Sequence, residues 1–381
     1  MTRRRTATLA LLVASAVALG AGVVPSVHEA VAVRADSAVA PAHLEPTAGP
    51  VPGLRTGTIR VPDLGGGAHR VRVGVVEPQG EPVADVLFLH GHADRLDNHA
   101  ALTTALARAG VRVVSFDLPS HGRTDAGAID RWSFDDLAAL AGRVLQATGT
   151  DADRPLVLAG WSFGGLLASR IVQDPGRAAA LGRPVRGLVL ESPAVVPSLF
   201  PGGDGVSRLR ALTHDLHAPV AGRPDPASPF TDPVFAGRLV AQAQVARVTP
   251  LPAGLPTLVE LGGDHEDRYV DVPAVRAWAE DVAPRDGAPV RVVSCAGGRH
   301  ALDLEAWPVG VAARSAIVDF VRSAVDAGPV PHGHVGSVGS VRSVDADADA
   351  DADVDADTVT DTDTNTDTVT VTDTEEAAAC R

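Results

Sequence analysis

The fold of this chain is decided by residues 154–169, which have the sequence RPLVLAGWSFGGLLAS. The apolar run at 156–158 indicates a buried strand, and the residues after Gly164 have helical spacing. Between them, the G-W-S-F-G pentapeptide at 160–164 forms a sharp turn with Ser162 at its apex. Such a pentapeptide also arises by chance, so the strand before it and the helix after it carry the prediction. We expect the Ser162 hydroxyl above the sheet edge, at the positive end of a helix.

Apolar runs alternate with helical patterns on both sides of this turn. Residues 56–61 and 70–76 are predicted to pair as two strands around a run of glycines. Further strands are predicted at 86–89, 111–116, 185–190, 257–261 and 290–294. Strands alternating with helices indicate an α/β fold, with a mostly parallel sheet covered by helices on both faces. Ligands bind at the carboxyl ends of the strands in such sheets.

The chain begins with a segment typical of secretion. The stretch Thr-Arg-Arg-Arg at 2–5 precedes an apolar run at 7–24, and the A-V-A triplet at 30–32 offers a cleavage site. This layout predicts a signal peptide over 1–32 and a secreted protein. The alternative is a retained membrane anchor, because the run is just long enough to span a bilayer.

The middle of the chain is long enough for one large domain. Residues 33–54 contain several prolines and alanines and are predicted to be a linker, and 55–327 are predicted to form the α/β domain. Between 195 and 253 the alternation of strands and helices stops, and Pro and Gly surround two helical patterns. This insertion is predicted to form a small helical cap, placed before the predicted strand at 257–261. A surface excursion is the alternative.

Most of the formal charge of −14 lies near the carboxyl terminus. Residues 341–381 contain eleven Asp and two Glu against two Arg. We therefore predict a disordered acidic tail over 328–381, because this composition leaves little to bury. The rest of the chain is close to neutral and has no basic excess that would indicate nucleic-acid binding.

The chain has two cysteines. Cys295 follows a predicted strand, whereas Cys380 lies at the end of the acidic tail. Because their contexts differ so much, a structural disulfide between them is not expected.

A serine hydroxyl needs a base to act as a nucleophile, and the base needs an orienting acid. Two predicted strands later in the chain are followed by suitable side chains. His300 comes after the strand at 290–294, and both Asp264 and Asp267 come after the strand at 257–261. A lone histidine after a strand is usually structural. This one follows both a serine turn and an acidic loop, so we predict that it is the base.

The reaction also needs hydrogen-bond donors for the oxyanion that develops on the substrate. The backbone N–H of Phe163, directly after the serine, is predicted to be one donor. The backbone N–H of His92 is predicted to be the other, because Gly91 lets the chain turn close to the site. The side chain of His92 could simply line the pocket.

A metal site is the competing interpretation. Residues 90–94 fit an H-x-H-x-D pattern, and the D-H-E-D run at 264–267 contains typical metal ligands. That pattern usually continues with another histidine, where this chain has Arg95. A metal would also leave Ser162 and His300 unexplained. We therefore predict no metal and no cofactor.

Over residues 56–325 the chain resembles the monoacylglycerol lipase and lysophospholipase-like branch of the α/β-hydrolases. The order of serine, acid and histidine is that of these enzymes. By resemblance, the nucleophile, acid and base fall on Ser162, Asp267 and His300, with Asp264 as the alternative acid because the acid loop is longer here. The matching landmarks are His90-Gly91, Asp117 with His121-Gly122, residues 160–164, Ser192-Pro193, Asp232-Pro233, residues 267–271 and Gly298-Arg299-His300.

The resemblance implies the α/β-hydrolase fold and a secreted serine hydrolase that cleaves carboxylic esters. The expected substrates are small or lipid-like esters such as monoacylglycerols or lysophospholipids, with the cap in transient contact with a lipid surface. Two alternatives stay open: an amide or peptide hydrolase with the same triad, and a hydrolase-like binding protein without turnover. The sequence does not indicate the oligomeric state.

Overall fold

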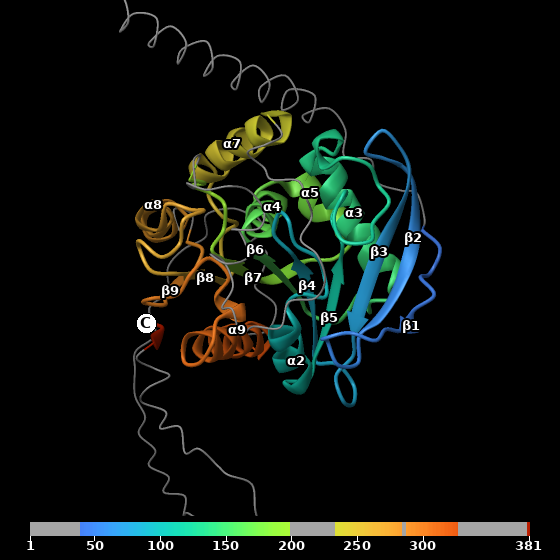
Figure 1. Cartoon of the computed structure of the whole chain (residues 1–381), viewed down its shortest axis with the longest axis horizontal. Helices are drawn as coiled ribbons and strands as arrows, with labels where there is room; N and C mark the ends of the chain where they lie inside the picture. Colours follow the sequence, from blue (N-terminus) through green and yellow to red (C-terminus); the bar gives the residue numbers. More distant parts are fainter. Residues whose placement is uncertain (1–38, 199–232, 284–286, 327–378) are drawn as a thin grey trace, which may run out of the picture.

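The computed structural model describes residues 39–198, 233–283, 287–326 and 379–381. A nine-stranded sheet runs through this part of the chain in the order β1-β2-β3-β5-β4-β6-β7-β8-β9 (Figure 1). The pairs from β5 to β9 are parallel, and the pairs from β1 to β5 are antiparallel. The strands are β1 (Glu45–Pro46), β2 (Arg55–Leu64), β3 (Gly67–Val76), β4 (Ala84–Leu89), β5 (Val111–Phe116), β6 (Leu156–Trp161), β7 (Val185–Glu191), β8 (Thr257–Leu261) and β9 (Val290–Ser294).

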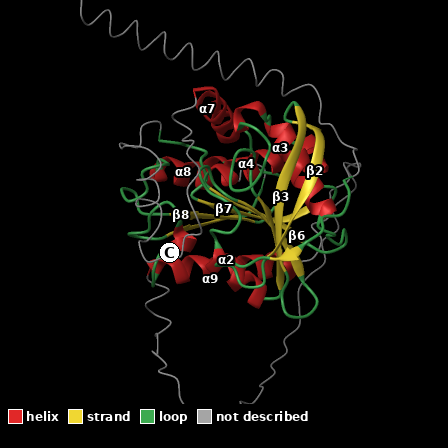
Figure 2. Ribbon diagram, turned by 45° about the vertical axis from the view of Figure 1, so that its right-hand side comes forward, coloured by secondary structure: helices red, strands yellow, loops and turns green. Residues whose placement is uncertain are grey.

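Helices cover both faces of the sheet, as the alternation in the sequence predicts (Figure 2). One face packs against α2 and α9, and the other packs against α3, α4, α5 and α8. The helices are α2 (Ala100–Arg108), α3 (Phe134–Ala147), α4 (Phe163–Val172), α5 (Pro175–Ala180), α7 (Pro233–Val248), α8 (Val272–Ala277) and α9 (Val309–Asp326). The short elements are η1 (Ile129–Arg131), η2 (Trp278–Val282) and η3 (Leu302–Leu304).

The central strands are buried along their whole length. Because helices close off both faces, these strands need apolar side chains on both sides, which explains their continuous apolar runs. Three carboxylic acids are exceptions, Asp85 in β4, Glu191 at the end of β7 and Glu260 in β8, and all three are almost fully buried. The carboxyl ends of β4, β6, β7, β8 and β9 meet at one edge, where the motifs predicted from the sequence follow them.

The predicted linker at 33–54 is wrong for its second half. Residues of β1 pair with β2, and the side chains of Val51 and Leu54 are buried against Val76 and Leu96. These few apolar residues pack at the edge of the sheet in spite of the surrounding prolines. The ordered domain therefore begins before residue 55.

Several predictions from the sequence fall outside the described residues. They are the signal peptide at 1–32, most of the tail, and much of the predicted cap, since 199–232 is not described. The second helical pattern of the cap lies in α7, which packs on α4 (Figure 1). Within the described ranges, no helix has the length and apolar character needed to cross a membrane.

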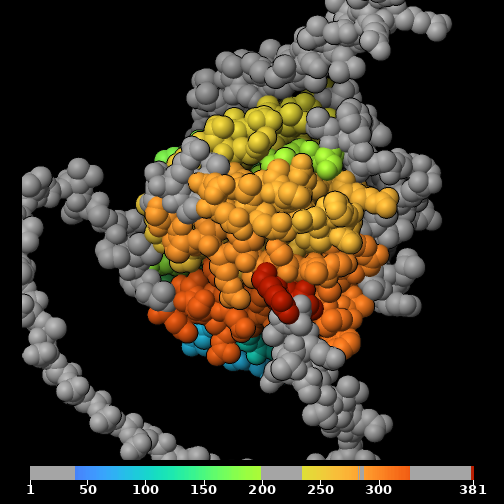
Figure 3. All heavy atoms as spheres, turned by 90° about the vertical axis from the view of Figure 1, so that its left-hand side faces the viewer, coloured from blue at the N-terminus to red at the C-terminus, as the bar shows by residue number. Residues whose placement is uncertain are grey.

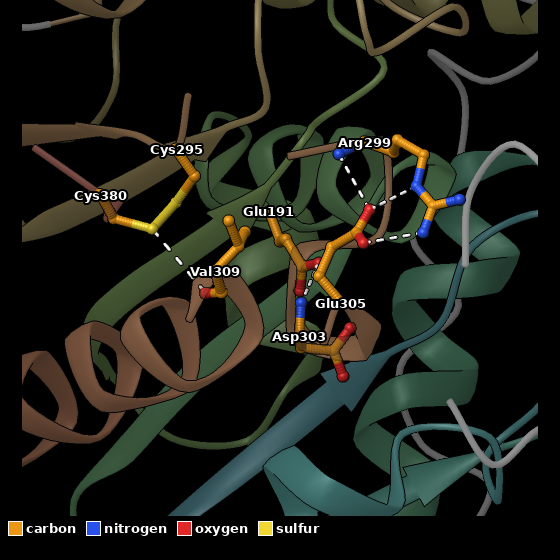
Figure 4. Close-up of a disulfide and its surroundings, with 7 residues drawn as sticks. All are labelled: Glu191, Cys295, Arg299, Asp303, Glu305, Val309 and Cys380. Carbon is orange, nitrogen blue, oxygen red and sulfur yellow. Dashed lines mark hydrogen bonds and ion pairs between the residues drawn. A yellow bond between two sulfur atoms is a disulfide. The ribbon is translucent and has the colours of Figure 1, made fainter. Parts of the chain in front are cut away.

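The expectation that the two cysteines stay unpaired is wrong, because Cys295 and Cys380 form a disulfide (Figure 4). Cys295 directly follows β9, the last strand of the sheet. The N–H of Arg381 donates to the carbonyl of Ser294 over 2.9 Å, and the N–H of Ser294 donates back to Arg381. The chain end thus pairs with an edge strand whose backbone groups would otherwise be open. Figure 3 shows residues 379–381 lying against the domain, so the prediction of a disordered tail fails at its last residues.

We predict that this disulfide stabilises the domain. Losing a native disulfide commonly costs about 2–5 kcal/mol of unfolding free energy, which corresponds to a fall of several degrees in Tm for a domain of this size. Cys380→Ser and truncation after residue 327 should therefore lower Tm by similar amounts in calorimetry. Under reducing conditions the intact chain, Cys380→Ser and the truncated chain should have the same Tm. A truncated chain that melts like the oxidised intact chain would contradict the pairing.

Candidate active site

The turn between β6 and α4 holds Ser162 in a backbone conformation that few residues other than glycine adopt. Its φ is 54° and its ψ is −115°, a strained combination of the kind found at functional sites. A Cβ at Gly160 would overlap the backbone of Gly164, and a Cβ at Gly164 would overlap the carbonyl of Leu89. Close backbone approach therefore requires both glycines. The serine side chain is left at the N-terminal end of α4.

Ser162, His300 and Asp267 form one chain of hydrogen bonds. Nε2 of His300 lies 2.8 Å from Oγ of Ser162, and Nδ1 of His300 lies 2.8 Å from Oδ2 of Asp267. Because an ionised carboxylate can only accept, Nδ1–H donates to Asp267 and Nε2 is left to accept from the serine hydroxyl. His300 and Asp267 are both buried. The structure thus brings together the three residues that the sequence predicts as nucleophile, base and acid.

Neighbouring groups hold the acid and the base in this arrangement. Oδ1 of Asp267 accepts from the backbone N–H groups of Tyr269 at 2.9 Å and Val270 at 3.3 Å. The indole N–H of Trp161 donates to the carbonyl of His300 over 2.8 Å. The ring of Tyr269 lies 5.0 Å from the imidazole of His300. The carboxylate and the imidazole are therefore oriented by fixed partners.

The alternative acid, Asp264, takes no part in the hydrogen bonds that join Ser162, His300 and Asp267. Its carboxylate pairs with the guanidinium of Arg276 at 2.7 Å and is exposed to solvent. The hydrogen bond from Arg276 lowers the pKa of Asp264 below its usual value, although its slight burial opposes this. The N–H of Asp267 donates to the carbonyl of Gly263 over 3.3 Å. The added residues 264–266 therefore form an outward turn that returns the chain to Asp267.

The loop after β4 lies directly against the nucleophile. A Cβ at Gly91 would overlap the ring of Trp161 and would stand 3.2 Å from the Cβ of Ser162. His92 follows this contact, and its N–H donates to no acceptor among the residues that the structure describes. Phe163 is the first residue of α4, where an N–H group has no acceptor within the helix. These are the two N–H groups that the sequence predicts as oxyanion donors.

Two buried histidines fix the shape of this loop. The N–H of Leu118 donates to Nε2 of His90 over 2.9 Å, and the N–H of Ala93 donates to Nε2 of His121 over 3.1 Å. Ala93 has a φ of 60°, so its unusual conformation is held by a specific bond. Burial lowers the pKa of His90 to about 3, against the opposing charge of Asp94. His90 is therefore neutral and can accept.

The same contacts occupy side chains of both candidate metal motifs. Nε2 of His90 accepts from Leu118, and its Nδ1 lies 2.7 Å from the carbonyl of Gly91. Asp264 faces solvent beside Arg276. Within the described part of the chain, no group of three or more His, Cys, Asp or Glu side chains is placed to hold an ion. His90 and Asp264, one from each motif, are thus held by other partners.

Sequence reasoning missed Phe235, in the first turn of α7. Its ring lies 4.8 Å from the ring of His92 and 5.2 Å from the ring of Phe163. The side chain of His92 is buried, its Nδ1 has no hydrogen-bond partner, and burial keeps its pKa well below the usual value. An aromatic residue of α7 thus packs on both residues that offer oxyanion donors. Only a three-dimensional contact identifies it, because nothing in its local pattern points to the site.

The acid assignment can be tested with a matched pair of variants. Asp267→Asn removes the acceptor that sets the tautomer of His300, so turnover should fall by roughly 10⁴-fold, the loss known for the orienting acid of a serine protease triad. Asp264→Asn should change turnover little, because this side chain binds only Arg276. Steady-state kinetics, in variants with matching melting curves, measures both. A larger loss in Asp264→Asn than in Asp267→Asn would move the acid to Asp264.

The sequence has measurable similarity to known proteins. The profile of the family described as "Serine aminopeptidase, S33" matches residues 80–233. Protein phosphatase methylesterase 1 of Homo sapiens, Rattus norvegicus and Pongo abelii is 34% identical to this chain over 84 residues. These residues make up 22% of this chain and 22% of each methylesterase, so the chain matches about a fifth of the length of these relatives.

Solved structures share the fold. A lipase in its open form has a TM-score of 0.54 and 22% identity, over 71% of this chain and 99% of the lipase chain. The protein DcsB, in complex with its substrate analogue, has a TM-score of 0.51 and 14% identity, over 71% of this chain and 99% of its own. At these identities the likeness establishes the fold. Together with the mostly parallel sheet and the strained serine turn, this likeness shows that the chain has the α/β-hydrolase fold.

Proposed function

We propose that this protein is a secreted serine hydrolase that cleaves carboxylic esters. The observation that carries the proposal is the continuous chain of hydrogen bonds from Ser162 through His300 to Asp267, with the serine on a strained turn. A structural serine would not need a strained backbone, a buried imidazole at 2.8 Å and a buried carboxylate behind it. This also argues against a hydrolase-like binding protein, because every position of the triad is filled.

The geometry supports a two-step reaction. Oγ of Ser162 attacks the ester carbonyl carbon while Nε2 of His300 takes the hydroxyl proton, and Asp267 stabilises the imidazolium that forms. The N–H groups of His92 and Phe163 are placed to bind the oxyanion. The imidazolium then returns the proton to the leaving alcohol, which leaves an acyl group on Ser162. Water, deprotonated by His300, attacks this acyl group and releases the carboxylic acid.

The surroundings of the serine favour an apolar acyl group. The ring of Phe163, the residue after the serine, lies 5.2 Å from the ring of Phe235, and the neutral ring of His92 lies 4.8 Å from the ring of Phe235. Apolar and aromatic walls with few polar groups are typical of sites for small organic ligands. We therefore propose lipid-like esters, such as monoacylglycerols or lysophospholipids, with α7 at the side from which a lipid surface would approach.

A second candidate function is hydrolysis of amides or peptides by the same triad. The description of the matching family profile, "Serine aminopeptidase, S33", is the observation that favours it. The names of the methylesterase and lipase relatives favour esters. Both reactions use the same steps at Ser162, so only the preferred leaving group separates them.

Two observations support secretion. The first 32 residues have the layout of a signal peptide. Independently, Cys295 and Cys380 are joined in a disulfide, and such bonds persist in oxidising compartments outside the cytosol. Together they support a site of action outside the cell.

A substrate panel tests the proposed function. We expect turnover of 4-nitrophenyl esters from short to long acyl chains, of a monoacylglycerol and of a lysophospholipid, with little turnover of amino-acid 4-nitroanilides. Preference for the anilides would establish the peptidase alternative. Absence of turnover on every compound, in folded protein, would favour a binding protein.

We also predict that the triad residues act as a unit. Ser162→Ala and His300→Ala should each remove nearly all ester turnover, and the double variant should be little worse, because groups that share one mechanism are strongly non-additive. Melting curves control for folding. Losses that multiply independently in the double variant would show that the two residues do not share a mechanism.

A further inference from the structure

Glu191 connects the turn that carries Ser162 with the loop that carries His300. It is the last residue of β7 and is 1% exposed. Its main-chain carbonyl accepts the N–H of Ser162 over 2.9 Å. Its side-chain Oε1 accepts the N–H of Asp303 over 3.1 Å (Figure 4). One residue therefore binds the backbone of the nucleophile and the backbone of η3, which begins two residues after His300.

Asp303 is held from its other side by a buried histidine. Nδ1 of His99 lies 2.8 Å from Oδ2 of Asp303, and Nε2 of His99 lies 2.7 Å from Oδ2 of Asp94. The charges of Asp303 and Asp94 raise the pKa of His99 well above its usual value, although burial opposes this. His99 is therefore a cation between two carboxylates. The loop that carries His300 is therefore held through Asp303, whose carboxylate binds His99 and whose N–H binds Glu191.

Arg299 gives the same loop a separate attachment. Its guanidinium Nε lies 2.8 Å from Oε1 of Glu305, and its Nη2 lies 2.8 Å from Oε2 (Figure 4). Its backbone N–H also donates to Oε1 of Glu305, over 3.0 Å. These bonds are local, within six residues. Glu191 and Trp161 both link this loop to the strand and turn that carry Ser162: Oε1 of Glu191 accepts the N–H of Asp303, and the indole N–H of Trp161 donates to the carbonyl of His300.

The surroundings of Glu191 are rich in acids. Glu260 from β8 and Asp303 from η3 face it, and the positive groups nearby are His99, before α2, and Arg314 on α9. His99 is already shared by two carboxylates, and Arg314 binds the main-chain carbonyl of Asp303. Among the described residues, Oε2 of Glu191 has no hydrogen-bond partner, and neither carboxyl oxygen of Glu260 has one.

A charged carboxylate is costly in such a place. Burial, and then the charges of Asp303 and Glu260, raise the pKa of Glu191 well above its usual value. The same causes, burial and Asp303, raise the pKa of Glu260 well above its usual value, although the charge of Arg291 opposes them. Without a free cation to pair with, a buried acid is most stable when it keeps its proton. Its Oε1 can still accept the N–H of Asp303 in that form.

We propose that Glu191 is a positioning residue, which sets the distance between Ser162 and His300 through its two hydrogen bonds and does so as an uncharged carboxylic acid. The inference rests on the proposed hydrolase function and adds to it a residue outside the triad. Glu191 acts by holding the nucleophile turn and the loop that carries His300 in register.

Three variants of the intact, oxidised chain test the positioning role. Glu191→Gln keeps the shape and the acceptor, so kcat on a 4-nitrophenyl ester should stay within about twofold. Glu191→Leu leaves the N–H of Asp303 unbound, and kcat should fall on the order of 10- to 100-fold with KM little changed, since small misplacements of catalytic groups cost that much. Glu260→Leu is the control, because its carboxyl group holds nothing, and it should keep the kcat of the wild type.

Stability measured against pH tests the uncharged state. A raised pKa in the folded protein means that the unfolded chain loses its proton first, beginning near the usual value of 4.5. The wild type should therefore lose stability as pH rises from there toward the raised value. Glu191→Gln cannot lose a proton, so its Tm should match the wild type near pH 4.5 and exceed it at pH 8. This measurement is independent of activity.

Each outcome decides one part of the proposal. Equal kcat in Glu191→Leu and the wild type would overturn the positioning role. A loss in Glu191→Gln as large as in Glu191→Leu, or a Tm of Glu191→Gln below that of the wild type at pH 8, would overturn the uncharged acid. Failure of the hydrolase function is distinguishable, because the wild type itself would then be inactive while the comparison of Tm against pH still stands.

Discussion

The backbone strain at Ser162 is the constraint on which the site depends. A φ of 54° at a residue other than glycine costs on the order of 1–3 kcal/mol and persists only where the surroundings impose it. Here the end of β7 imposes it from both sides: the N–H of Ser162 donates to Glu191, and the carbonyl of Ser162 accepts from Ala194 over 2.9 Å. The neighbouring strand thus holds the serine hydroxyl where a base can reach it.

The parallel sheet explains how residues so far apart in sequence meet. Ser162, Asp267 and His300 each follow a strand, namely β6, β8 and β9, and parallel strands bring their carboxyl ends to one edge. The disulfide then ties the chain end to the last of these strands, five residues before His300. The edge of the sheet nearest the base is in this way closed by the protein itself.

Much of this could be predicted from the sequence, because strands, turn glycines and the order of serine, acid and histidine are local patterns. What could not be predicted depends on contacts across the fold. Cys380 lies 85 residues after Cys295, behind a repetitive acidic sequence, so its pairing with Cys295 left no local signal. Phe235 likewise reaches the site only through the placement of α7. Glu191 did leave a trace, as an acid at the end of an apolar strand, but its bond to Asp303 spans more than a hundred residues.

The central claim is that Ser162 is a nucleophile activated by His300, and covalent labelling tests it most directly. A fluorophosphonate reacts with an activated serine without any choice of ester, and mass spectrometry of the digested protein locates the adduct. The account predicts one adduct, on Ser162, that forms far more slowly in His300→Ala and not at all in Ser162→Ala. An intact, folded chain that stays unlabelled at Ser162, or that is labelled equally fast without His300, would contradict it.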